Sequence, residues 1–300
     1  MEEFSLEEIE HIKKDYKTNN VEYEEMLEKA RKMTFFDCKT YEKPIAVFVG
    51  GQTGAGKGGI DVYSTQEFRK MNVKSTVIDD DQYRMLHPRA REILKKYPTL
   101  YTEITGVETA TITSSILKEA ISKRYNFVFE GTMKNTRILD ETMKNMPDCF
   151  TKIVRVMATS NLESLLTAFE RNEAQIEIVG YGRFTNVLTH NKSYDGVLNT
   201  LKVIEESGVP EIIEVLARTE NILAPRLVYS SQNKNNRYKS AYEALIEERE
   251  KNREEAKKSA MDRLKKILSA RNVGEDEKQQ RKLLEQEIEN MMKEKKIWKN

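Results

Sequence analysis

A glycine-rich loop carrying a single lysine follows a short apolar run, and this pairing constrains the fold more than any other feature of the chain. The apolar run at 45–49 is typical of a buried strand, and a helix is predicted to begin at Lys57. The spacing Gly51-x-x-x-x-Gly56-Lys57 matches the P-loop pattern, in which backbone N–H groups, a lysine and a helix N-terminus bind phosphates. We therefore expect a nucleoside triphosphate site, with an ordinary glycine turn as the alternative. The predicted nucleotide-binding residues are Gly51, Gln52, Thr53, Gly54, Ala55, Gly56, Lys57, Gly58 and Gly59.

One position in this loop departs from the pattern. The residue after the lysine is normally Ser or Thr, whose hydroxyl binds Mg²⁺, but this chain has Gly58. The expected cofactors are therefore ATP and Mg²⁺, with the metal ligands unassigned.

Composition limits the kind of partner that the whole chain can attract. The 300 residues contain 50 Lys and Arg against 49 Asp and Glu, so the net charge gives no reason to expect nucleic acid or an anionic membrane. Cys38 and Cys149 follow no metal or redox spacing and are expected to be free thiols. With no basic, apolar leader and no apolar run of about 20 residues, a cytoplasmic location is expected.

Together with the P-loop, the pattern of apolar residues predicts an α/β fold with a mostly parallel central sheet flanked by helices. We expect N-terminal helices packed on the core over residues 1–43, a P-loop kinase domain over 44–236 and a charged helical C-terminal extension over 237–300. Further strands are predicted at 73–79, 127–129, 153–157, 212–217 and 226–230, and helices at 5–16, 21–33, 57–71, 107–123, 161–174, 193–207 and 276–295.

Acidic side chains come at the ends of two predicted strands. Asp79, Asp80 and Asp81 end the strand at 73–79, and Glu130 ends the strand at 127–129. Because parallel strands end at one edge of a sheet, these acids should lie near the P-loop; a solvated acidic turn is the alternative. Strand alternation predicts Asp79 and Asp81 on one side and Asp80 on the other.

Two arginines supply candidate positive charge. Arg171 lies near the end of the helix predicted at 161–174, and Arg183 follows the glycines of a loop that resembles a mobile flap. An exposed loop arginine without a role is the alternative for Arg183. His190, farther along, is assigned no role.

Together these residues provide the parts that phosphoryl transfer requires. Lys57 would hold the β- and γ-phosphates, and Asp81 or Asp79 would accept the proton of the acceptor hydroxyl. Arg171 and Arg183 would neutralise the charge that develops on the transferred group. The predicted catalytic residues are Asp81, Lys57, Arg171 and Arg183, and Asp79 and Asp81 are also predicted to bind the acceptor substrate.

The ordered set of motifs resembles the zeta toxin family over about residues 44–230. The segments that carry the resemblance are Gly-Gln-Thr-Gly-Ala-Gly-Lys at 51–57, Ile-Asp-Asp-Asp at 78–81 with Arg84 and His87-Pro88, Phe-Glu-Gly-Thr at 129–132, and Glu170-Arg171.

The resemblance implies a kinase that phosphorylates a sugar hydroxyl of UDP-N-acetylglucosamine and is inhibited by a small helical antitoxin. It makes Lys57 the phosphate-binding lysine and Asp81 the catalytic base. Glu130 and Thr132 match the pair that contacts the nucleotide sugar, while Arg171 and Arg183 match the arginines that bind ATP phosphates. The chain departs from the family at Gly58 and at Lys134, where arginine is common.

Two other interpretations of the same residues stay open. A kinase of the same fold could act on a nucleoside, an antibiotic or another small alcohol. Alternatively, Gly58 could indicate lost catalysis in a nucleotide-binding interaction protein whose C-terminal helices bind a partner.

Overall fold

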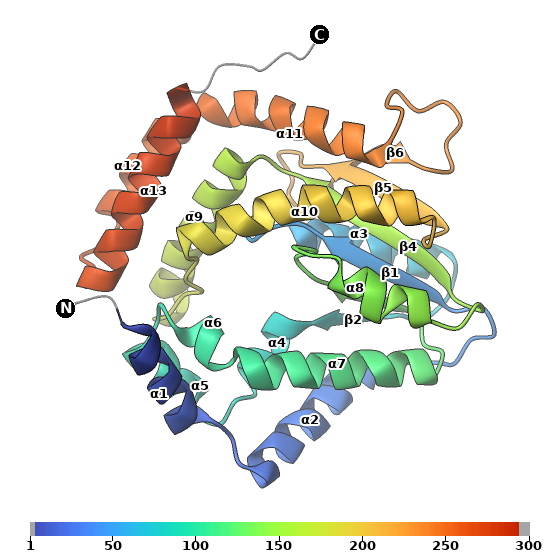
Figure 1. The fold of residues 1–300 in the computed structure, drawn as a ribbon, viewed down its shortest axis with the longest axis horizontal. Coiled ribbons are helices and arrows are strands. Elements are labelled where there is room, and N and C mark those ends of the chain that lie inside the picture. The colour runs from blue at the N-terminus through green and yellow to red at the C-terminus, as the bar shows by residue number, and fades with distance from the viewer. Residues whose placement is uncertain (1–3, 294–300) are drawn as a thin grey trace.

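In the computed structural model, which describes residues 4–293, a single six-stranded sheet runs through the centre of the molecule (Figure 1). The strand order is β2-β3-β1-β4-β5-β6, and only the pairing of β6 with β5 is antiparallel. The predicted α/β fold with a mostly parallel sheet is therefore confirmed. The strands are β1 Ile45–Gly50, β2 Thr76–Asp79, β3 Phe127–Glu130, β4 Thr151–Ala158, β5 Ile212–Ala217 and β6 Arg226–Ser230.

The sheet separates two apolar cores, and successive residues of β1 face them in turn. Phe48 packs in the larger core with helices α2, α7, α10 and α11, whereas Val47 and Val49 face the smaller core beneath α3. A strand that is covered on both faces needs a continuous apolar run, which is why residues 45–49 contain no polar side chain. The helices of these layers are α2 Asn20–Phe35, α3 Lys57–Lys70, α7 Gly106–Ser122, α10 Val187–Ser207 and α11 Ala241–Lys257.

Several observed boundaries differ from the predicted ones because caps decide where a helix begins and ends. Helix α9, Asn161–Val179, continues past the predicted end at residue 174 and stops at Gly180, which adopts a left-handed conformation. Helix α10 begins at Val187 rather than at residue 193, because the Asn186 side chain accepts from the N–H of Thr189. The strand predicted at 73–79 is shorter, since ladder pairing of β2 begins only at Thr76.

Short helices and the N-terminal helix build a third apolar cluster, which lies beside the sheet. Helix α1, Leu6–Tyr16, begins with a capping box between Ser5 and Glu8 and places Ile12 and Tyr16 against Ile93 and Tyr101. The remaining short elements are α4 Asp80–Arg84, α5 Ala90–Lys96, α6 Tyr101–Ile104, α8 Arg137–Glu141 and a 3₁₀ turn at Met143–Asn145.

The C-terminal helices pack against α9 and form an apolar cluster of their own with it. Helices α12, Ala260–Ser269, and α13, Glu275–Lys293, lie beside α9 at one end of the molecule (Figure 1). Arg263 donates to Glu163 at 2.5 Å and to Glu170 at 2.7 Å, so partly buried ion pairs accompany the apolar contacts. The last helix was predicted to reach residue 295, and its final two residues lie outside the described residues.

Two further expectations concern membranes and cysteines. Between residues 4 and 293, no helix is both long and apolar enough to cross a membrane. Cys38 and Cys149 are free thiols, as predicted.

Candidate active site

The loop between β1 and α3 depends on glycine at the positions where the chain turns most tightly. Gly54 and Gly56 have φ angles of +78° and +94°, a region that other residues rarely adopt. A Cβ atom on Gly54 would lie 1.9 Å from the carbonyl oxygen of Ser164 in α9. The loop can therefore lie directly against α9 only with glycine at residue 54.

Side chains from three other elements bind consecutive carbonyl groups of the loop. Because the C=O and the following N–H of a trans peptide point in opposite directions, carbonyls held outward turn N–H groups inward. The N–H groups of Gly54 and Gly56 accordingly point away from these contacts and would be available to a phosphate bound on the other side of the loop. The contacts are His190 Nε2 to Thr53 O at 3.0 Å, Arg218 Nη1 to Gly54 O at 3.3 Å and Thr159 Oγ1 to Ala55 O at 2.7 Å.

His190, which was given no role from sequence, is therefore part of the support of the P-loop. Burial lowers the pKa of His190 to about 4, so the ring is neutral near pH 7. Since the Thr53 carbonyl can only accept, Nε2 carries the proton of this neutral ring. Its position was not predictable from sequence, because residue 190 was expected to lie in a loop before the helix.

Lys57 and Glu130 meet where the loop enters helix α3. Lys57 Nζ lies 3.6 Å from Glu130 Oε1 and 3.5 Å from the carbonyl oxygen of Gln52. Parallel pairing places Glu130 beside Val49, and the following residue, Gly131, donates its N–H to Val49 O at 3.0 Å. The structure thus brings together the lysine and the strand-end acid that the sequence singled out.

Two further carboxyl groups crowd Glu130. Asp79 is its register partner on β2, and burial, followed by the charge of Glu130, raises the pKa of Asp79 to about 6. Burial and Glu130 also raise the pKa of Asp61, which begins the second turn of α3. Burial alone would raise the pKa of Glu130, but the Lys57 ammonium and a hydrogen bond from Asp61 lower it overall.

Asp61 is absent from the residues predicted from sequence. The sequence feature that could have identified Asp61 is its position four residues after Lys57, which places it one helical turn along α3 on the same face.

The three successive aspartates do not alternate as a strand would require. Asp79 ends β2 and accepts from the N–H of Asp81, so helix α4 begins at Asp80 and the predicted alternation is wrong. Asp80 instead pairs with Arg84 and accepts from Thr113 Oγ1 at 3.4 Å. Asp81 pairs with Arg84 as well, at 2.9 Å from its Nε.

The segment predicted as a flap is folded over Asp81. A Cβ on Gly182 would lie 2.4 Å from the carbonyl oxygen of Asn172, so the segment packs closely on α9. The N–H of Arg183 donates to Gln175 Oε1 at 2.9 Å, and its guanidinium pairs with Asp81. The flap arginine therefore lies in the site and is not an exposed loop residue.

Arg171 lies in α9 and has unsatisfied hydrogen-bond donors among the residues that the structure describes. Within residues 4–293, its Nε and Nη2 are buried and have no hydrogen-bond partner. Burial lowers the pKa of Arg171, while the carboxylates of Glu130 and Asp79 oppose that change. A buried guanidinium with unsatisfied donors is suited to an anionic oxygen, and a triphosphate supplies several.

Thr132 belongs to a loop that is fixed on both sides. The next residue, Met133, is buried with φ at +48°, which is unusual for a bulky side chain. A Cβ on Gly196 of α10 would lie 2.2 Å from Lys134 O, so the backbone of α10 supports this loop. Thr132 itself is half-buried, in the segment that follows Glu130.

The position of the missing hydroxyl is open to solvent. Gly58 is exposed, and a Cβ there would meet no atom within 4 Å. Across the described chain, no group of three or more His, Cys, Asp or Glu side chains is arranged to hold a metal ion. Mg²⁺ normally keeps several waters and is bound by one or two carboxylates together with substrate phosphates.

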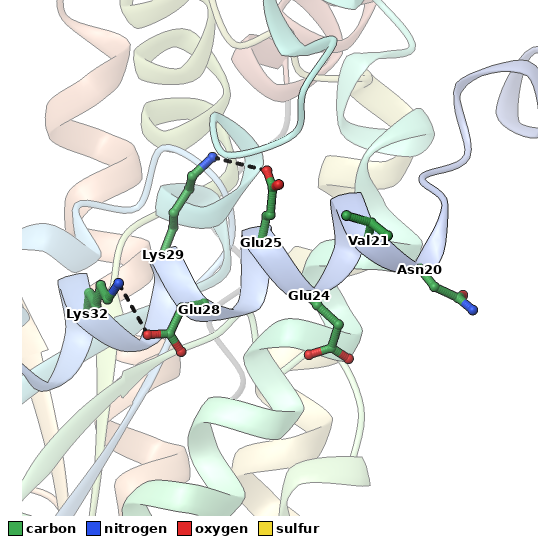
Figure 2. Close-up of a pocket in the computed structure, with 7 residues that line it drawn as sticks. All are labelled: Asn20, Val21, Glu24, Glu25, Glu28, Lys29 and Lys32. Atoms are coloured by element: carbon green, nitrogen blue, oxygen red, sulfur yellow. Dashed lines mark ion pairs between the residues drawn. The ribbon is translucent and has the colours of Figure 1, made fainter.

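A surface hollow of about 630 Å³ lies along α2 and is lined by residues of that helix, none of which belongs to this site (Figure 2). Two of its three glutamates pair with lysines of the same helix, Glu25 with Lys29 at 3.9 Å and Glu28 with Lys32 at 3.4 Å. It has no arrangement suited to catalysis.

The fold and the loop together define a P-loop protein of the α/β class, with carboxylates and arginines grouped at the phosphate cradle. The sequence model described as "Zeta toxin" matches residues 29–241, and the chain belongs to the zeta toxin family.

Individual relatives agree with this assignment. The chain is 27% identical over 182 residues to Toxin PezT of Streptococcus pneumoniae serotype 4, a match covering 60% of this chain and 71% of the relative. It is 30% identical over 154 residues to Toxin zeta of Streptococcus agalactiae, covering 51% of this chain and 52% of the relative. It therefore spans about half the length of the latter protein.

A solved structure from the PezAT chromosomal toxin-antitoxin system of Streptococcus pneumoniae has a similar fold. The TM-score is 0.68 at 23% sequence identity, and the match covers 85% of this chain and 99% of that chain.

Proposed function

We propose that the chain is an ATP-dependent kinase that transfers the γ-phosphate to a sugar hydroxyl of UDP-N-acetylglucosamine. The observation that carries this proposal is the contact between Lys57 Nζ and Glu130 Oε1 at 3.6 Å. It joins the loop suited to binding a triphosphate to the acid that the family resemblance assigns to the nucleotide sugar. A donor and an acceptor bound to these two residues would lie side by side.

On the donor side, the inward N–H groups of the loop and Lys57 would hold the β- and γ-phosphates. The free donors of Arg171 point to a role in neutralising the charge of the transferred group. Arg183 would do the same after exchanging its pairing with Asp81 for a phosphate oxygen. When bound, Mg²⁺ would neutralise phosphate charge, held by the phosphates, water and the carboxylates of Asp79 or Asp81.

On the acceptor side, Glu130 and Thr132 would bind the sugar nucleotide. The acceptor hydroxyl oxygen forms a bond to the γ-phosphorus while the bond from that phosphorus to the β–γ bridging oxygen breaks. Asp81 would orient the hydroxyl and take its proton. Asp79 is the alternative base, because its raised pKa of about 6 makes it a stronger base than an ordinary carboxylate.

The relatives support a biological role as a toxin that is inhibited by an antitoxin. Toxin PezT and the PezAT toxin-antitoxin system carry that role in their names. We propose that this chain likewise binds an antitoxin and poisons its host by consuming a nucleotide sugar.

The test is an acceptor panel with γ-labelled ATP and Mg²⁺, comparing wild type with Lys57→Ala, Asp81→Asn and Asp79→Asn. Label transfer to UDP-N-acetylglucosamine by wild type, lost in Lys57→Ala, is the expected result. The aspartate whose substitution abolishes transfer while ATP still binds is the base.

Transfer to a different alcohol or nucleoside, with none to UDP-N-acetylglucosamine, would show that this other compound is the acceptor substrate. ATP binding without transfer to any acceptor would instead favour a nucleotide-binding interaction protein, which Gly58 makes the specific competing function.

A further inference from the structure

Arg249 is a buried arginine of α11 that contacts the P-loop from outside the region matched to the family, which ends at residue 241. Its side chain is 3% exposed, and its Nη2 donates to Gln52 Oε1 at 3.2 Å. We propose that Arg249 is a positioning residue that holds the P-loop in its phosphate-binding form through Gln52. The identity of the ligand rests on the proposed function, whereas the effect on the loop itself does not.

Gln52 is the residue through which this effect is transmitted. Its side chain is fully buried, and Nε2 donates to Thr159 O at 2.9 Å and to Ser164 Oγ at 3.0 Å. These donations leave Oε1 as the acceptor, and arginine has only donors to offer it. The Gln52 amide therefore joins the loop to the end of β4, the start of α9 and the middle of α11.

The contacts of Arg249 require the shape of a guanidinium. Its Cζ lies 4.0 Å from the ring centroid of Tyr194 in α10, and Nη1 donates to Tyr194 O at 3.2 Å. Stacking on a ring while donating from two nitrogens needs a planar fork, which a lysine ammonium lacks. Arg249 thus fixes α10 and the P-loop relative to each other.

The charge of Arg249 also favours an anion on the other side of the loop. Both of its hydrogen-bond acceptors, the Tyr194 carbonyl and the Gln52 amide, are neutral. Burial lowers the pKa of Arg249, while Tyr194 and the charge of Asp195 oppose that change. The guanidinium of Arg249, whose hydrogen-bond acceptors are neutral, therefore adds to the positive potential on the side of the P-loop where a phosphate would bind.

The experiment compares wild type with Arg249→Met, Arg249→Lys and the matched control Arg281→Met. Arg281 is also buried, at 4% exposed, but it donates to Ile267 O at 2.6 Å and to Glu173 at 2.8 Å, away from the P-loop. Amide hydrogen exchange of residues 51–58 is measured without nucleotide, and ATP and adenosine affinities are measured by calorimetry. Melting temperatures report general loss of stability.

We expect faster exchange at residues 51–58 in Arg249→Met and a loss of about tenfold in ATP affinity, equivalent to about 1.4 kcal/mol, with adenosine affinity unchanged. Arg249→Lys, which keeps the charge and loses the fork, should fall between wild type and Arg249→Met. Arg281→Met should lower the melting temperature without changing exchange in the loop.

Unchanged exchange at residues 51–58 in a folded Arg249→Met or Arg249→Lys protein would overturn the inference, as would an equal change in Arg281→Met. Failure of the wild type to bind ATP would overturn the proposed function instead. The exchange measurement without nucleotide would then still decide the role of Arg249.

Discussion

Replacing Gly58 with serine restores the hydroxyl that P-loops present to Mg²⁺, and the structure allows the change without steric cost. A Cβ at residue 58 would meet nothing within 4 Å, and the residue lies in the first turn of α3. Gly58→Ser should therefore stabilise the helix by about 0.5 kcal/mol, because serine is intermediate between glycine and alanine in helix propensity. This corresponds to a rise in melting temperature of about 1–2 °C.

The same variant should lower the Mg²⁺ concentration at half-maximal ATP turnover by about tenfold, if the added hydroxyl contributes about 1.4 kcal/mol to metal binding. Gly58→Ala is the matched control, since it stabilises the helix at least as much and supplies no ligand. Gly59→Ser is the opposite control, because a Cβ there would lie 2.2 Å from the carbonyl oxygen of Ile222. Equal Mg²⁺ dependence of Gly58→Ser and Gly58→Ala would refute the reasoning.

Three further predictions concern the P-loop, a carboxyl group of the site and an ion pair between α9 and α12. Gly54→Ala should destabilise the protein by about 2 kcal/mol or more and abolish ATP binding, because φ is +78° and the added Cβ would lie 1.9 Å from Ser164 O; denaturant unfolding and calorimetry measure both effects. The pKa of Asp79 is about 6 in the folded protein against an ordinary 3.8, so protonation of this carboxyl stabilises the fold. Its contribution to the free energy of unfolding is complete below about pH 4 and is lost as pH rises through about 6. Asp79→Asn, which keeps the cap of α4, should therefore raise the melting temperature relative to wild type at about pH 8 and not at about pH 4, and equal differences at both would contradict this assignment. Arg263→Met leaves Glu170 without this ion pair and Glu163 with its second partner, Arg218, and should cost about 1–2 kcal/mol in unfolding free energy, whereas the exposed pair broken by Lys258→Met should cost less than about 0.5 kcal/mol.

The sequence predicted the sheet and the P-loop because both depend on local patterns. The apolar run before Gly51 and the glycine spacing were sufficient to place β1, the loop and α3. Because parallel strands end at one edge of a sheet, Glu130 could be predicted to lie near Lys57. Errors arose where capping decided the outcome, as at Asp79, whose side chain starts a helix instead of continuing a strand.

The residues that support the loop could not be predicted, because they come from distant parts of the chain. His190 reaches Thr53 across 137 positions and Arg249 reaches Gln52 across 197. No local pattern marks such contacts, since each depends on how α10 and α11 pack on the sheet. Asp61 was closer, and its helical spacing from Lys57 was a signal that could have been used.

The proposed kinase activity is tested most directly by mass spectrometry of UDP-N-acetylglucosamine after incubation with ATP, Mg²⁺ and the purified protein. We expect a product heavier by one phosphoryl group with wild type and none with Lys57→Ala, in equal amounts of folded protein. Unmodified nucleotide sugar with the wild type, under conditions in which ATP binds, would contradict it.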